Sequence, residues 1–293
     1  MSGHAGHEGL TELDYVLGQR RIVSVMGTVF TVDVRDLDPA SAALDDVVAW
    51  WRWVDATFST YRPSSQVSRL AAETLELADC APEVRHVLRL CREAAAISGG
   101  HFTERYDGRL DPTGMVKGWS VELASQMLRR AGSQHHCISA GGDVRCVGVP
   151  ESGERWRVGI VDPRDPGRLL AVVAAPQAPS SGLAVATSGT AERGHHIIDP
   201  VTGRPPQDLA SISVVGSDLT LVDWAATAAF AMGHDARAWI EAMDGLDAYA
   251  VTPEGDYWYT DGFEARAELV QVPLPPLTAW SVPATRRTTA GSS

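Results

Sequence analysis

The residues best suited to chemistry lie in one stretch, Gly108 to Ala124 (GRLDPTGMVKGWSVELA). Its first half runs from Asp111 to Gly114 and predicts a tight loop, because proline presets one backbone angle and glycine accepts positive ones. Lys117 follows, directly before an amphipathic segment that predicts a helix after Gly118. A carboxylate, a tight loop and a lysine at a helix start suit an anionic ligand, since helix N-termini offer free N–H groups and partial positive charge. An ordinary loop-to-helix junction with a surface lysine is the alternative.

A second reactive pair lies about a hundred residues later. The alanine-rich segment Leu219–Met232 predicts a helix that ends at Gly233, and it places Asp223 and Thr227 at positions i and i+4 on one face. A carboxylate on an otherwise apolar helix is costly to bury unless it is paired or binds a cation. The pattern therefore predicts either a paired group or a bound cation at Asp223.

Two glycine-containing interruptions occur in predicted strands. Met26-Gly27-Thr28 breaks the strand-like run Arg21–Arg35, which indicates a bulge or a bend where something approaches the backbone. Gly141-Gly142-Asp143 breaks residues 135–148, which indicates a backbone close to a ligand. Core packing is the alternative for Met26, and a simple β-turn is the alternative for the second break.

Two further segments have the composition of ligand-binding loops. Residues 58–70 (FSTYRPSSQVSRL) combine aromatic, arginine and hydroxyl side chains, and residues 186–205 (ATSGTAERGHHIIDPVTGRP) combine hydroxyls, histidines, glycine and proline. We expect the first of these segments at the rim of a site and not in a core.

The elements that must position these residues follow from periodicity. The pattern predicts helices over 39–58, 82–99 and up to Gly132, strands over 156–162 and 212–215, and hairpins over 163–183 and 249–259. Strands that alternate with helices but include hairpins indicate an α+β fold and not a doubly wound parallel sheet. Without a repeat or a clear linker, we expect one compact unit over 19–274, with a flexible N-terminus (1–18) and a Pro-, Thr- and Ser-rich flexible tail (275–293).

The bulk composition narrows the function classes. The 293 residues are 44% hydrophobic and 21% charged, with a formal charge of 25 − 37 = −12, which argues against a phosphate-backbone binder of nucleic acid. Four cysteines without CxxC spacing are typical of reduced thiols in a cytoplasmic protein. Neither a secretory signal nor an apolar run of transmembrane length is present, so we expect a cytoplasmic protein that is not membrane-embedded.

Taken together, the motifs resemble the ApbE family of FAD:protein FMN transferases. The resemblance spans roughly residues 20–260 and is carried, in the family's order, by Met26-Gly27-Thr28, residues 58–70, Gly100-His101-Phe102, Asp111–Trp119, Ala140–Asp143, Ala186–Gly189, His196–Pro205 and Asp223–Thr227. It implies a T-fold-related α+β unit with mixed sheets, packed helices and a flavin cleft between lobes.

The resemblance also implies an activity. Enzymes of the family use a divalent cation, here expected to be Mg²⁺, to transfer FMN from FAD to a Thr or Ser hydroxyl of a target protein, and they release AMP. The implied metal ligands are the Asp223 carboxylate, the Thr227 hydroxyl and the Gly114 carbonyl, a set of oxygens that suits Mg²⁺. Some members carry a second aspartate three residues after the first, where this chain has Ala226.

The remaining site residues are implied in the same way. The expected flavin- or nucleotide-binding positions are Met26, Tyr61, His101, Phe102, Thr103, Asp111, Lys117, Gly142, Asp143, Ser188 and Ile198. Asp223 and His196 are the expected catalytic residues, with His196 as the base for the acceptor hydroxyl. A structural histidine that holds the Asp199-Pro200 turn is the alternative for His196.

Two other functions use the same residues. One is an FAD pyrophosphatase that gives FMN and AMP with water as the acceptor; the other is a non-catalytic flavin-binding protein. The expected partners of the transferase are FAD and a target protein with an acceptor Thr or Ser.

Overall fold

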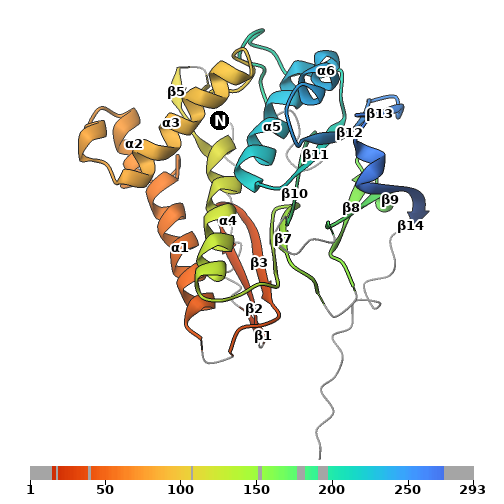
Figure 1. The fold of residues 1–293 in the computed structure, drawn as a ribbon. Coiled ribbons are helices and arrows are strands. Elements are labelled where there is room, and N and C mark those ends of the chain that lie inside the picture. The colour runs from red at the N-terminus through yellow and green to blue at the C-terminus, as the bar shows by residue number, and fades with distance from the viewer. Residues whose placement is uncertain are drawn as a thin grey trace, which may run out of the picture.

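A central sheet of nine antiparallel strands organises the computed structural model (Figure 1). The structure describes residues 15–17, 19–38, 41–106, 108–150, 154–176, 182–190 and 197–273. The sheet has the order β1-β2-β3-β6-β7-β10-β11-β12-β13. Its strands are β1 (Tyr15–Leu17), β2 (Arg20–Val25), β3 (Thr28–Val34), β6 (His136–Ala140), β7 (Asp143–Val147), β10 (Leu183–Gly189), β11 (Ser211–Gly216), β12 (Asp247–Val251) and β13 (Tyr257–Tyr259).

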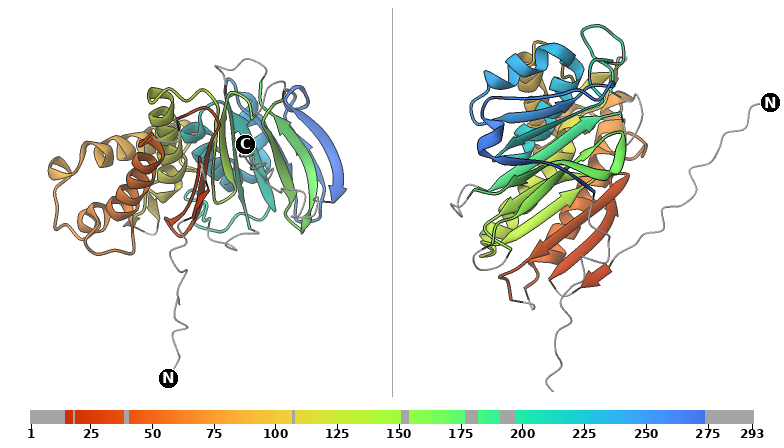
Figure 2. Two further views of the ribbon diagram at one scale, coloured as in Figure 1. Left: turned by 90° about the horizontal axis from the view of Figure 1, so that it is seen from below. Right: turned by 90° about the vertical axis from the view of Figure 1, so that its right-hand side faces the viewer.

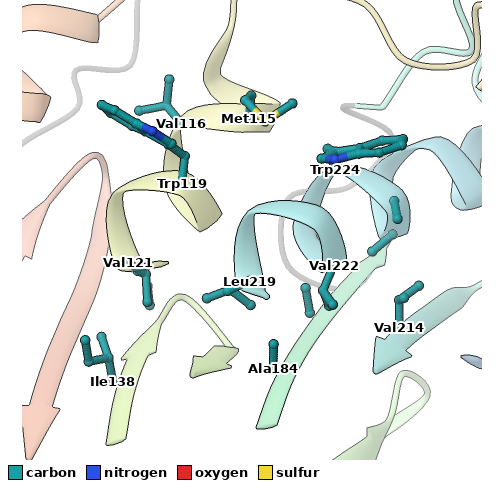
Figure 3. Close-up of a cluster of buried hydrophobic side chains, with 14 of the residues drawn as sticks. Met115, Val116, Trp119, Val121, Ile138, Ala184, Val214, Leu219, Val222 and Trp224 are labelled. Atoms are coloured by element: carbon teal, nitrogen blue, oxygen red, sulfur yellow. The ribbon is translucent and has the colours of Figure 1, made fainter. Parts of the chain in front are cut away.

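Helices cover one face of this sheet (Figures 1 and 2). They are α1 (Ala43–Phe58), α2 (Gln66–Ala71), α3 (Pro82–Ile97), α4 (Thr113–Arg130), α5 (Leu219–Met232) and α6 (Ala236–Glu241). Figure 3 shows Val121 of α4 over Ile138 of β6, and Leu219 and Val222 of α5 over Ala184 of β10. These side chains belong to the larger hydrophobic core, so α4 and α5 are held side by side by the strands beneath them.

A three-stranded sheet packs on the opposite face. Its order is β14-β9-β8, with β14 (Ala267–Pro273), β9 (Asp165–Ala174) and β8 (Arg157–Asp162). A second core, which includes Leu183, Val185 and Val215 of the large sheet, fills this interface. Strand β11 is therefore buried on both faces along its whole length, and β10 is buried from Leu183 to Ala186, in a helix–sheet–sheet arrangement. A short ribbon of β4 (Arg105–Tyr106) and β5 (Arg109–Leu110) completes the fold.

The predicted α+β class is confirmed, and so are most of the predicted elements. Helix α5 has the predicted bounds, and α1 and α3 lie within the predicted ranges. The two interruptions in predicted strands are two-residue turns: Met26-Gly27 joins β2 to β3, and Gly141-Gly142 joins β6 to β7.

Some expectations were wrong. Helix α4 begins at Thr113 and not after Gly118. The Asp111 carboxylate, two residues before Thr113 along the chain, accepts hydrogen bonds from the Thr113 N–H and hydroxyl, and so it satisfies one of the free N–H groups of the first turn. The segment around Ser188, to which no pattern gave a secondary structure, belongs to strand β10, and β1 lies inside the N-terminal part expected to be flexible. The elements α6 and β14 were not predicted. Among the described residues, no helix combines the length and apolarity needed to cross a bilayer.

Candidate active site

The crossing of α4 and α5 is unusually close at one glycine. A Cβ on Gly118 would lie 2.4 Å from the Leu219 carbonyl oxygen and 2.6 Å from the Asp223 Cβ, so only glycine fits without a shift of backbone. The Gly118 N–H donates to Asp223 Oδ2 at 2.7 Å. This contact provides the partner predicted for Asp223, and it joins two residues that are 105 positions apart.

Lys117 lies between two carboxylates. Its Nζ donates to Asp223 Oδ1 at 3.1 Å and forms a second ion pair with Asp143 Oδ2. The Asp143 and Asp223 side chains are only 1% and 7% exposed, whereas that of Lys117 is 27% exposed. The three residues form a buried acidic pair with one partly accessible cation, which we call the Lys117 triad.

Asp143 is held in place from the other side. It directly follows the Gly141-Gly142 turn, and its Oδ1 accepts a hydrogen bond of 3.1 Å from the Thr187 N–H of the neighbouring strand β10. A Cβ on Gly141, whose φ is +54°, would lie 2.8 Å from Thr28 Oγ1. The break is therefore the simple β-turn given as the alternative, and the β2–β3 hairpin lies close to its backbone.

The expected metal ligands come from both helices. Thr227 Oγ1 donates to the Asp223 carbonyl at 3.3 Å and lies 3.5 Å from Ser188 Oγ of β10. In a regular helix the Gly118 N–H would donate a hydrogen bond to the Gly114 carbonyl. The Asp223 carboxylate also accepts this N–H, so it competes with the Gly114 carbonyl for it.

This donor set fits a hard cation. A carboxylate, a hydroxyl and a carbonyl that shares its usual donor are the oxygens that Mg²⁺ accepts. In the described ranges no group of three or more His, Cys, Asp and Glu side chains could hold a metal. The expected ligand set contains only one carboxylate, that of Asp223, so it would not be found as such a group.

Phe102 and His101 connect the start of α4 to the loop at 199–204. The fully buried Phe102 ring lies against Gly114, 3.2 Å from the position of its added Cβ, and packs edge-on against Trp224 at 6.0 Å. Next to it, His101 Nδ1 lies 2.9 Å from Asp199 Oδ1.

Asp199 organises the loop at 199–204. Its carboxylate accepts the N–H groups of Val201 and Thr202, and its backbone pairs with Arg204. Burial works against ionisation of Asp199, but hydrogen bonds from Thr202 and Val201 and the proximity of His101 lower its pKa overall. An open hollow of about 460 Å³ borders the same loop and is lined by Thr202, Arg204, Pro205 and Gln207.

Met26 and Tyr61 are linked through Asp55. Met26 has a positive φ of 51°, and its N–H donates to Asp55 Oδ1 at 3.0 Å. The other oxygen of Asp55 accepts Arg62, whose neighbour Tyr61 is 93% exposed. A non-glycine residue in this conformation is strained, and the Asp55 hydrogen bond helps to maintain it.

Other predicted site residues have local roles or none that is visible. Asp111 Oδ1 accepts the Thr113 N–H at the start of α4, and Thr103 Oγ1 accepts the Arg105 N–H at 3.1 Å. Ile198 is half-buried. His196 lies outside the described residues.

Sequence reasoning missed a buried ion pair beside the site. Arg145 Nε donates to Glu122 Oε2 at 2.8 Å, and the same oxygen accepts the Leu219 N–H at 2.9 Å. Glu122 thus fixes Leu219, the first residue of α5, which lies four residues before Asp223. Its position four residues after Gly118, on the face of α4 that meets α5, was the available signal.

Comparison with known proteins gives a consistent family. The model of the ApbE family matches residues 26–106 and 103–250. An FAD:protein FMN transferase of Rhodobacter capsulatus is 36% identical over 186 residues, which are 60% of this chain and 34% of that protein. One of Vibrio cholerae is 30% identical over 135 residues, which are 43% of this chain and 39% of that protein. The chain thus spans well under half the length of these two relatives in the matched parts.

Solved structures share the fold. A single-residue variant of the flavin transferase ApbE from Vibrio cholerae superimposes with a TM-score of 0.71 at 18% identity, over 87% of this chain and 99% of that one. The ApbE protein from Thermotoga maritima gives the same TM-score and coverage at 20% identity. The family model spans well over half of the sequence, and the chain belongs to the ApbE family.

Proposed function

We propose that this protein transfers FMN from FAD to a Thr or Ser hydroxyl of a target protein and releases AMP, with Mg²⁺ as the cofactor. The observation that carries the proposal is the α4–α5 crossing, where the Asp223 carboxylate accepts the Lys117 ammonium and the Gly118 N–H, and Thr227 follows one turn later on α5. The names of the curated relatives support the same activity.

The residues at the crossing have distinct roles in this proposal. Asp223, Thr227 and the Gly114 carbonyl would hold Mg²⁺, which supplies charge neutralisation for the pyrophosphate and the departing AMP. Lys117 contributes a compact positive charge next to the nucleotide phosphates. Asp143, fixed by the Thr187 N–H, orients Lys117 toward Asp223.

The flavin is bound by surrounding segments. Met26 offers a polarisable side chain on a rigid turn, and the exposed Tyr61 ring is free to stack on a flat ligand. His101 and Phe102 border Gly114 and the 199–204 loop, and Ser188 adds a hydroxyl beside Thr227.

The direct test is a reaction with FAD, Mg²⁺ and a co-expressed candidate acceptor. Intact-mass and peptide measurements should find an FMN phosphoester on one Thr or Ser, absent in excess EDTA and restored by Mg²⁺. Asp223→Asn should abolish the adduct. Full transfer in EDTA would refute the metal role.

The same reaction without an acceptor separates transfer from hydrolysis. A transferase should release AMP slowly until the acceptor is added. Rapid and complete AMP release with water alone would instead establish an FAD pyrophosphatase, and FAD binding without AMP release under either condition would establish a flavin-binding protein.

His196 is the proposed base for the acceptor hydroxyl. His196→Asn should lower the rate of transfer while FAD binding persists, since general-base catalysis contributes about 10²–10⁴-fold. Near-normal turnover of the variant would leave His196 a structural role at the Asp199 turn.

A further inference from the structure

We propose that Lys117 is an internal counter-ion that opposes divalent-cation binding at Asp223 until a dinucleotide pyrophosphate is present. The inference rests on the proposed function and concerns the binding equilibria that precede it. It predicts that metal and dinucleotide bind as a coupled pair, with Lys117 as the residue that couples them.

The geometry of the triad carries the proposal. Each carboxylate has one oxygen fixed by a backbone N–H, Asp143 by Thr187 and Asp223 by Gly118. The remaining oxygen of each faces the same Lys117 ammonium. A cation that binds the free oxygen of Asp223 must therefore share it with Lys117 or displace the ammonium.

The local charge favours displacement of the Lys117 ammonium from Asp223 only when phosphates bind as well. Two carboxylates and one ammonium give the triad a net charge of −1, and a divalent cation alone would change it to +1 next to buried groups. A pyrophosphate with two negative charges returns the sum to −1 and gives Lys117 a new anionic partner. The state with metal and pyrophosphate therefore keeps the net charge of the resting triad and leaves no cation without an anionic partner, which is costly near buried groups.

The composition of the chain makes Lys117 distinctive. It is the only lysine in the sequence, and the other 24 of the 25 basic residues are arginines. A compact ammonium on a flexible stem can move between partners, whereas a planar guanidinium would clamp both carboxylates. A movable counter-ion needs the compact charge and flexible stem of lysine.

The test measures Mn²⁺ binding by electron paramagnetic resonance, with ADP as a diphosphate probe that has no flavin to transfer. A titration without protein corrects for the Mn²⁺–ADP complex. Without ADP, Lys117→Met should bind Mn²⁺ about tenfold or more tightly than wild type, within the usual range of coupling between sites. Lys117→Arg, which keeps the charge, should bind as weakly as wild type.

The effect of ADP completes the test. ADP should strengthen Mn²⁺ binding by a larger factor in wild type than in Lys117→Met. Equal or weaker Mn²⁺ binding by Lys117→Met, or an equal effect of ADP on both proteins, would overturn the proposal.

The single lysine also allows a test without substitution. Wild-type protein labelled with ¹³Cε-lysine should show one lysine signal. Mg²⁺ and ADP together should shift it at Mg²⁺ concentrations where Mg²⁺ alone does not. A full shift with Mg²⁺ alone would refute the coupling. FMN transfer without coupling would refute only this inference, and coupling without transfer would refute only the proposed function.

Discussion

Gly118→Ala is the substitution whose effect the structure defines best. The added Cβ would lie 2.4 Å from the Leu219 carbonyl oxygen, 2.6 Å from the Asp223 Cβ and 3.0 Å from Asp223 Oδ2. The two closest atoms are on or next to the backbone of α5, so they cannot move without a shift of that helix. The substitution should therefore separate α4 from α5.

The magnitude follows from three opposing contributions. Replacing glycine by alanine inside a helix stabilises by about 0.5–1 kcal/mol. Overpacking costs about 1–3 kcal/mol, and loss of the Gly118 N–H bond to the Asp223 carboxylate costs about 1.5–3 kcal/mol. We expect a net loss of roughly 2–5 kcal/mol in the free energy of unfolding.

Urea unfolding of the variant and of a matched control measures this loss. Gly114→Ala, in the same helix, meets only the Phe102 ring at 3.2 Å and 3.7 Å, and it should change stability by less than about 1 kcal/mol. Mn²⁺ binding should weaken in Gly118→Ala because Asp223 moves with α5. If Gly118→Ala matched the wild type in both stability and Mn²⁺ binding, the close helix contact would be wrong.

Three further predictions concern buried polar groups. Glu122→Gln should destabilise by about 3–5 kcal/mol in urea unfolding, because it leaves the buried Arg145 cation without its partner; an unchanged midpoint would contradict this. Burial, followed by the charge of Arg145, lowers the pKa of His136 from 6.5 to about 3. Since the unfolded chain then binds a proton that the folded chain does not, stability should fall as pH drops below 6.5, by up to about 1.4 kcal/mol per unit, and a flat profile between pH 6.5 and 5 would refute the shift. The thiols of Cys137 and Cys146 face each other across β6 and β7 with Sγ atoms 3.2 Å apart. A mild thiol oxidant such as diamide should join them and make the protein lighter by two hydrogen atoms, and Cys137→Ser should not react.

The sequence predicted those elements whose patterns are local. Helix α5 was found because a continuous alanine-rich run ends at Gly233, whose φ of +64° terminates the helix. The start of α4 was missed because Asp111 and Pro112 have turn composition, whereas the Asp111 side chain accepts the N–H of Thr113, the first residue of the helix. Strand β10 was missed because its small and hydroxyl-bearing residues gain their burial from two neighbouring layers.

For the candidate site, too, the sequence predicted only what a local pattern indicates. A buried aspartate on an apolar helix required a partner, and that requirement correctly predicted a contact for Asp223. The identity of the partner depends on the α4–α5 crossing, which no local pattern encodes. The Lys117 ion pairs and the His101–Asp199 contact also join residues far apart in the sequence, so they became visible only in the fold.

The separation of Lys117 from Asp223 along the chain has a consequence for biosynthesis. The two residues are 106 positions apart, so α5 must leave the ribosome before Lys117 and Asp223 can come into contact. A nascent chain that contains Lys117 alone has no complete site. Long-range closure of this kind is slow compared with the formation of single helices. Ligands that need both halves bind only the folded chain and stabilise it by mass action. Binding of a ligand that contacts both helices would thus report that the chain has finished folding.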